Sequence, residues 1–277
     1  MRLLLFSILL PALILLISYS NSNALDESNN IVSRGFEVAQ NETQSTKPVP
    51  TDEISLNQIL DNHLKAIGGR EAWQKIETLK VRGHMFTSKA TFRVAALYKR
   101  PDLCRLDFQA GRMYFVEAYD GKTPWQMNHT TTTSAQILTG KRAKEMIDTC
   151  DFDGPLVDHK KKGHKIKFLG EQKVDERNAY VLKVNLTTGN LDTYYIDTET
   201  FLPFMIKGKT TIQENIVNTT IKIGEYIELS DIVVPFSFEF IVDGNPDTET
   251  LQIKTVEINS DLPNDLFDMP KRPEDLR

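Results

Sequence analysis

The chain has 277 residues, 33 of them Lys or Arg and 38 Asp or Glu, for a formal net charge of −5. This net negative charge argues against nucleic-acid binding, which requires a basic stripe or patch on the protein surface. The length suits one large β domain or at most two small ones.

The N-terminus has the pattern of a secretory signal peptide over residues 1–24. Met1-Arg2 precedes an apolar run from Leu3 to Ile17, and a polar stretch then ends in Ser22-Asn23-Ala24. We expect cleavage after Ala24, because the apolar run is short for a membrane span and is followed by a small-x-small site. An uncleaved anchor is the alternative, and Pro11 disfavours it. No cysteine lies at the end of the apolar run, so we expect a released periplasmic protein without a lipid anchor.

Residues 25–52 are rich in Asn, Ser, Thr and Glu and predict a flexible leader before a domain over 53–277. Apolar residues at helical spacing predict a helix from Ile54 to Ile67, which Gly68-Gly69 ends. A second short helix is expected over 70–76 and carries Trp73.

From Leu79 onward the apolar pattern has a period of two, which is typical of β-strands. One helix interrupts it, over Gly140 to Thr149, and an ordered loop follows over 151–157. The predicted strands lie at 92–98, 113–119, 123–127, 165–174, 179–186, 192–197, 203–211, 217–228, 233–242 and 249–259. Without intervening helices, these strands predict an antiparallel meander. About ten strands cannot stay flat, so we expect a strongly curved sheet with helices on its concave side.

No catalytic motif is present, and none of the five histidines has metal-ligand spacing. Four aspartates cluster near the helical interlude, at positions 148, 151, 153 and 158, where acid–base chemistry competes with the commoner helix-end and turn roles. The only cysteines are Cys104 and Cys150. Their pairing stays open, since an exported protein permits a disulfide and Cys104 equally suits a buried free thiol.

Aromatic residues recur on the predicted sheet. Val234, Phe236, Phe238, Phe240 and Val242 share one strand face. In the N-terminal half, the candidate ligand-lining residues are Phe92, Phe108, Phe115, Trp125 and Met127. Alternating aromatics usually form a packed core, but a curved sheet with few short helices leaves room for an apolar cavity.

Several segments resemble outer-membrane lipoprotein-sorting-like proteins, over about residues 54–270. The resemblance is carried by Leu60 to Trp73, Tyr119 to Trp125, Asp151 to Asp158, Thr193 to Asp197 and Leu202-Pro203. It implies an incomplete antiparallel β-barrel with an apolar interior, capped by short helices, that moves acyl chains of lipoproteins through the periplasm without cofactor or covalent chemistry. It also implies an arginine that holds the helical lid shut, a role that matches neither Arg93 nor Arg105 residue by residue.

The leading hypothesis is therefore a periplasmic carrier of a hydrophobic acylated ligand, with outer-membrane lipoproteins as one candidate cargo and with envelope donor and acceptor proteins as partners. Trp73 and the 140–149 helix are the candidate cap. A non-enzymatic cell-envelope interaction module with a packed core is the second hypothesis. A hydrolase that uses the aspartate cluster is the third. No catalytic residue, cofactor or metal site is assigned.

Overall fold

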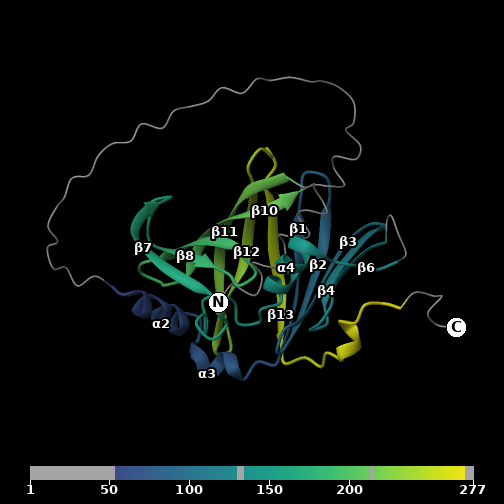
Figure 1. Cartoon of the computed structure of the whole chain (residues 1–277), viewed down its shortest axis with the longest axis horizontal. Helices are drawn as coiled ribbons and strands as arrows, with labels where there is room; N and C mark the ends of the chain where they lie inside the picture. The colour runs from purple at the N-terminus through teal and green to yellow at the C-terminus, as the bar shows by residue number, and fades with distance from the viewer. Residues whose placement is uncertain (1–53, 130–133, 213–214, 272–277) are drawn as a thin grey trace, which may run out of the picture.

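The computed structural model describes residues 54–129, 134–212 and 215–271. In these residues, 13 strands form one sheet in the order β6-β5-β4-β3-β2-β1-β13-β12-β11-β10-β9-β8-β7. Every neighbouring pair is antiparallel. The sheet curves strongly, and α4 lies within the curve (Figure 1). The predicted fold class, a curved antiparallel sheet that forms an incomplete barrel, is confirmed.

Ten of these strands lie within two residues of the predicted ranges, whereas β1, β3 and β6 have no predicted range. The strands are β1 Thr78–Phe86, β2 Thr91–Lys99, β3 Leu103–Ala110, β4 Met113–Tyr119, β5 Pro124–Asn128, β6 Gln136–Ile137, β7 Lys165–Val174, β8 Arg177–Asn185, β9 Leu191–Asp197, β10 Pro203–Ile212, β11 Asn215–Leu229, β12 Ile232–Val242 and β13 Glu249–Ile258. The turn between β4 and β5 shows why turn residues in the sequence predict where strands end. The Asp120 carboxylate accepts hydrogen bonds from the backbone N–H groups of Lys122 and Thr123, and Gly121 adopts a φ of 86°.

The order of the strands leaves the sheet open. β1 and β13 are central neighbours, whereas the two edges are β6 and β7. The chain between these edges contains helix α4 (Gly140–Thr149), whose bounds match the prediction. Since the described residues give β6 and β7 no mutual pairing, the barrel stays incomplete.

Within the part of the chain that the structure describes, two helices precede the sheet, α2 (Leu56–Ala66) and α3 (Gly69–Gln74). Ser55 begins α2 with a capping box, in which its hydroxyl accepts from Gln58 N and Gln58 Oε1 accepts from Ser55 N. Gly68 separates the helices at a φ of 110°, and a Cβ there would lie 2.0 Å from the Asp231 carbonyl oxygen. Only glycine therefore fits this contact with the β11–β12 turn.

Trp73 of α3 and His63 of α2 fix this helical pair to the rest of the fold. The Trp73 indole N–H donates to the Ile67 carbonyl oxygen, and its ring belongs to the main buried cluster. The His63 Nδ1 lies 2.9 Å from the Phe201 carbonyl oxygen. Burial lowers the pKa of His63 to about 3, so its ring is neutral and Nδ1–H donates this bond. Its role is structural.

The predicted signal peptide (1–24) and leader (25–52) lie outside the described residues, and a single domain over 53–277 stays a prediction. Among the described helices, none has the length and apolar character to cross a membrane.

Candidate ligand-binding interior

The inward face of the sheet carries a continuous cluster of buried apolar side chains. On β2, β3 and β4 it contains Phe92, Phe108 and Phe115, each at most 2% exposed. Phe108 and Phe115 are direct cross-strand partners, and the Phe92 and Phe115 ring centroids are 6.3 Å apart. The structure therefore brings these three predicted lining residues together on the concave face.

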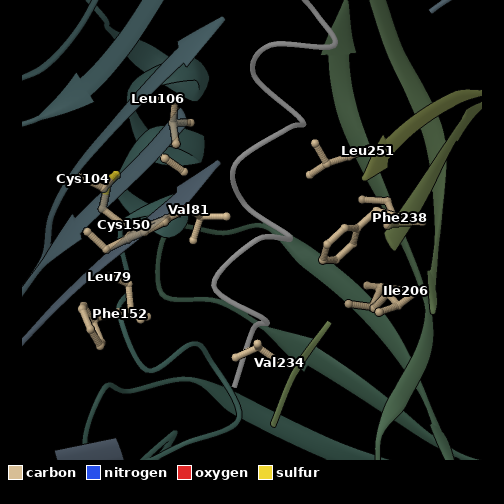
Figure 2. Packing of buried hydrophobic residues seen from close by; sticks show 14 of the residues in the cluster. Leu79, Val81, Cys104, Leu106, Cys150, Phe152, Ile206, Val234, Phe238 and Leu251 are labelled. Atoms are coloured by element: carbon tan, nitrogen blue, oxygen red, sulfur yellow. A yellow bond between two sulfur atoms is a disulfide. The ribbon is translucent and has the colours of Figure 1, made fainter. Parts of the chain in front are cut away.

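The other half of the sheet contributes to the same cluster. The predicted shared face of β12 is confirmed, because Val234, Phe238 and Phe240 all belong to this cluster. Figure 2 shows Phe238 and Leu251 pointing inward from one side of the sheet and Leu106 of β3 from the other. The apolar surface thus extends across both halves of the half-barrel.

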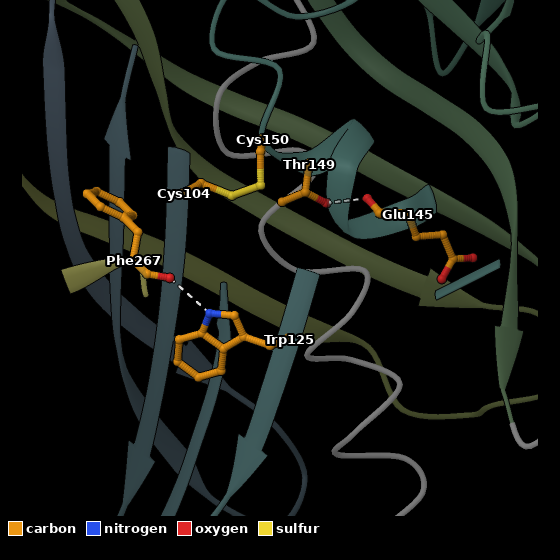
Figure 3. The surroundings of a disulfide bond; sticks show 6 residues. All are labelled: Cys104, Trp125, Glu145, Thr149, Cys150 and Phe267. Atoms are coloured by element: carbon orange, nitrogen blue, oxygen red, sulfur yellow. Dashed lines mark hydrogen bonds between the residues drawn. A yellow bond between two sulfur atoms is a disulfide. The ribbon is translucent and has the colours of Figure 1, made fainter. Parts of the chain in front are cut away.

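Trp125 and Met127 lie on the opposite, outer face. Their cross-strand partners are Ala118 and Val116, which alternate along β4 with the inward-facing Phe115. The Trp125 indole donates to the Phe267 carbonyl oxygen at 2.9 Å, under the C-terminal segment (Figure 3). The five candidate residues are therefore divided between two faces, and a role in ligand binding stays a prediction for each of them.

Cys104 and Cys150 form a disulfide, which settles the pairing that the sequence leaves open. The bond joins β3 to the residue that follows α4, and both cysteines are fully buried (Figure 3). Met146 of α4 is also fully buried in the main cluster. The disulfide therefore holds the C-terminal end of α4 against the concave face.

A buried ionic cluster lies beside the rest of α4. Arg142 of α4 pairs with Glu117 on the inward face of β4, and its guanidinium is 3.6 Å from the Glu145 carboxylate. Glu117 is fully buried and Glu145 is 5% exposed. Burial raises the pKa of both carboxyl groups, and Arg142 opposes this rise. Covalent and ionic contacts thus keep α4 on the sheet.

Replacing Arg142 with methionine should leave Glu117 buried without its cation. Loss of one partner of a buried pair costs about 3 kcal/mol or more, so we expect a fall of about that size in the free energy of unfolding. Chemical denaturation at neutral pH measures it. Lys141→Met is the control, because Lys141 is more exposed and lies 3.8 Å from Glu145. Equal losses in the two variants would contradict this account, and adding Glu117→Gln to Arg142→Met should restore most of the stability.

A second buried acid, Glu249, lies at the start of β13. It shares its strand face with Leu251 and Ile253 of the main cluster, and it is only 6% exposed. Among the described residues its Oε2 has no hydrogen-bond partner. Burial, assisted by the charge of Asp247, raises the pKa of Glu249 to about 8. A protonated carboxyl therefore faces the apolar interior at neutral pH.

The four clustered aspartates each have separate structural contacts. Asp151 pairs with Lys162, Asp153 with Arg100 and Asp158 with Arg70. Asp148 accepts hydrogen bonds from the side chains of Thr188 and Asn190. The contacts of Asp153 and Asp158 tie the segment after α4 to Arg100 and Arg70, whereas Asp151 and Lys162 both lie within that segment. Among the described residues, no three His, Cys, Asp or Glu side chains are grouped so that they could hold a metal ion.

Four buried charged residues, Glu117, Arg142, Glu145 and Glu249, were not predicted from the sequence. A signal for two of them exists: Glu117 follows Phe115 by two residues, and Glu249 precedes Leu251 by two. An acid in register with apolar residues of a half-buried strand indicates an inward carboxyl group. The partner Arg142 carries no such signal, because it comes from a distant helix.

No protein-family model and no curated protein matches the chain. Several solved structures do match. A LolA superfamily protein from Nitrosomonas europaea has a TM-score of 0.54 at 14% identity, over 78% of this chain and 98% of that chain. A DUF1329 family protein from Desulfovibrio piger has a TM-score of 0.54 at 10% identity, over 77% and 97%.

A putative outer membrane lipoprotein-sorting protein domain from Vibrio parahaemolyticus is similar to the same extent, with a TM-score of 0.53 at 12% identity over 76% of this chain and 95% of that chain. At such low identities the likeness concerns the fold. It confirms the resemblance seen in the sequence: this chain has the fold of LolA-like lipoprotein-sorting proteins.

Proposed function

We propose that this chain is a periplasmic carrier that binds the acyl chains of a lipid or lipoprotein against the concave face of its half-barrel. The observation that supports this most is the continuous apolar inward face, which two halves of an unclosed sheet share. Its fold is that of lipoprotein-sorting domains. No cofactor or covalent step is required, since binding and release suffice for transport.

The energy for such binding comes from burial of methylene groups. Each buried CH₂ contributes about 0.8 kcal/mol, so ten of them supply about 8 kcal/mol before the cost of ordering the chain. This corresponds to an affinity near the micromolar range. An acceptor with a slightly more favourable apolar site then removes the ligand without an energy source in this chain.

Helix α4 is the element that controls access in this proposal. It contacts β4 and β5 near the open edge of the sheet. The disulfide holds its C-terminal end, while Glu117 and Arg142 hold its first half through a reversible ion pair. We infer that a ligand enters when the first half of α4 moves away from β4.

The periplasmic location rests on the predicted signal peptide and on the disulfide. A buried disulfide is typical of proteins that fold in oxidising compartments. Expression of the full sequence in a bacterium, followed by mass spectrometry of the exported protein, tests cleavage after Ala24. Retention of the protein in the cytoplasm would contradict the location.

Ligand binding is tested by organic extraction of the purified exported protein and by displacement of a fluorescent fatty acid. We expect co-purified lipid, and an affinity that rises about fourfold for each added methylene in a series of saturated fatty acids. Absence of extracted lipid together with no saturable binding would favour the interaction module with a packed core.

Two adjacent alanines of β2 offer a matched pair of variants. Ala96 belongs to the inward cluster, whereas Ala95 lines the outer face. Ala96→Leu adds about three carbon atoms to the interior, which should displace a similar number of ligand methylenes and weaken binding by roughly fiftyfold. Ala95→Leu should leave acyl binding unchanged. Thermal melts establish that both variants fold, and equal acyl affinities in the two would contradict binding on the concave face.

A further inference from the structure

A basic groove lies on the outer face of the sheet, opposite the apolar interior. It has a volume of about 760 Å³ and is bounded by β1, β2, β3, β4, β13 and Leu266 of the C-terminal segment. Its charged residues come from four adjacent strands. They are Arg82, Arg93, Arg105, Asp107 and Lys254.

The register of the strands explains the hollow. Ala95 faces outward on β2, and its cross-strand partners are Arg82 on one side and Asp107 on the other. Arg93 and Leu97 flank it along the same face of β2. Neighbouring side chains on a sheet face stand about 5 Å apart, so the short side chain of Ala95 leaves a depression among longer ones. Ala95 therefore forms the floor of the groove.

The groove is positive although the chain is negative. It has four arginine or lysine residues and one acid, in a chain whose net charge is −5. Glu257 of β13 pairs with Arg82, and Asp107 pairs with Arg105. Arg93 instead donates to the neutral side-chain oxygen of Gln109 at 3.0 Å. Arg93 and Lys254 thus contribute the excess positive charge.

Part of the groove is rigid before any ligand binds. The Arg105 guanidinium donates to both carboxylate oxygens of Asp107, to the hydroxyl of Tyr114 and to the carbonyl oxygen of Leu266. Such contacts fix the planar fork of an arginine, which reduces the entropy lost on binding an anion. Leu97 and Leu266 add apolar surface beside these cations.

We propose that this basic groove binds the phosphate-bearing headgroup of an anionic lipid and so docks the protein on a membrane surface. Arginine forks match phosphate geometry, and the volume lies in the range of small-molecule sites rather than of extended protein interfaces. The apolar side chains beside the cations suit the glycerol end of the lipid. The proposal is independent of acyl binding, because it uses the opposite face of the same strands.

Flotation of the full chain with vesicles tests the proposal. We expect binding to vesicles that contain phosphatidylglycerol, weak binding to pure phosphatidylcholine, and a loss of binding as salt rises. Arg93→Gln should weaken binding to the anionic vesicles about fivefold. Ala95→Leu should also weaken it, since it fills the groove without a change in charge. Lys167→Gln is the control, because Lys167 is exposed on the distant edge strand β7 and carries the same charge.

Four outcomes would overturn the proposal. Equal binding to neutral and anionic vesicles would show that the protein does not recognise an anionic headgroup. Equal effects of Arg93→Gln and Lys167→Gln would show that the groove is not the binding surface. Unchanged binding of Ala95→Leu would show diffuse attraction without a seated headgroup. The fourth outcome is displacement of the protein from the vesicles by inorganic phosphate or by polyglutamate. At constant ionic strength and at concentrations matched to the lipid phosphate, such displacement would indicate that the groove binds a soluble anion or an acidic protein instead.

Discussion

Replacing both Cys104 and Cys150 with alanine should lower the free energy of unfolding by about 4 kcal/mol. The disulfide closes a loop with a sequence separation of 46, and the loop-entropy relation gives a value of this size. Since both cysteines are fully buried, solvent cannot replace the lost packing. The bond also fixes α4, so the variant should bind acyl ligands with a faster release rate.

Denaturant titration of the wild type with and without reductant, beside the double variant, measures this effect. Reductant should destabilise the wild type and leave the variant unchanged, which separates the loss of the bond from the loss of two sulfur atoms. A fall of less than about 1 kcal/mol in both comparisons would show that the bond contributes little to the fold.

Glu249→Gln should remove a large dependence of stability on pH. The pKa of Glu249 is raised from 4.5 to about 8 in the folded protein, so the folded state holds this proton more firmly than the unfolded chain. The corresponding stability is fully present below about pH 4.5, declines as pH rises and is lost above about pH 8. The total amounts to about 4 to 5 kcal/mol.

The measurement compares the free energy of unfolding of wild type and variant at several pH values from about 4 to 9. As pH rises across this range, the free energy of unfolding of the variant should increase relative to that of the wild type, because glutamine stays neutral at every pH. Glu239→Gln, at an exposed position on the neighbouring strand β12, is the control and should show no such gain. A constant difference between Glu249→Gln and wild type would mean that Glu249 is already ionised in the folded protein.

The sequence predicts the elements well because their signals are local. Period-two alternation and turn residues such as Asp120-Gly121 locate most strands within two residues, and the range of α4 is predicted without error. The face to which each strand points is harder. Trp125 and Met127 group with Phe92 by residue type, yet the register across the β4–β5 turn places them outside.

Long-range pairings are the part that the sequence does not reveal. Whether Cys104 meets Cys150, and whether Glu117 meets Arg142, depends on where α4 lies on the sheet. The basic groove cannot be predicted from the sequence for the same reason. Its cations come from separate strands, and the overall charge of −5 masks their proximity.

The central position of the β1–β13 ladder has a consequence for biogenesis. β1 forms one of the first strands to leave the ribosome, but its partner β13 is the last strand of the sheet. The two halves of the half-barrel therefore join only after nearly all of the chain is available. Such high contact order slows folding, so a secretion machinery has time to move the chain before it folds. Because β13 pairs with β1 at the centre of the sheet, truncation before β13 would separate the two halves of the sheet and would not merely remove an edge strand.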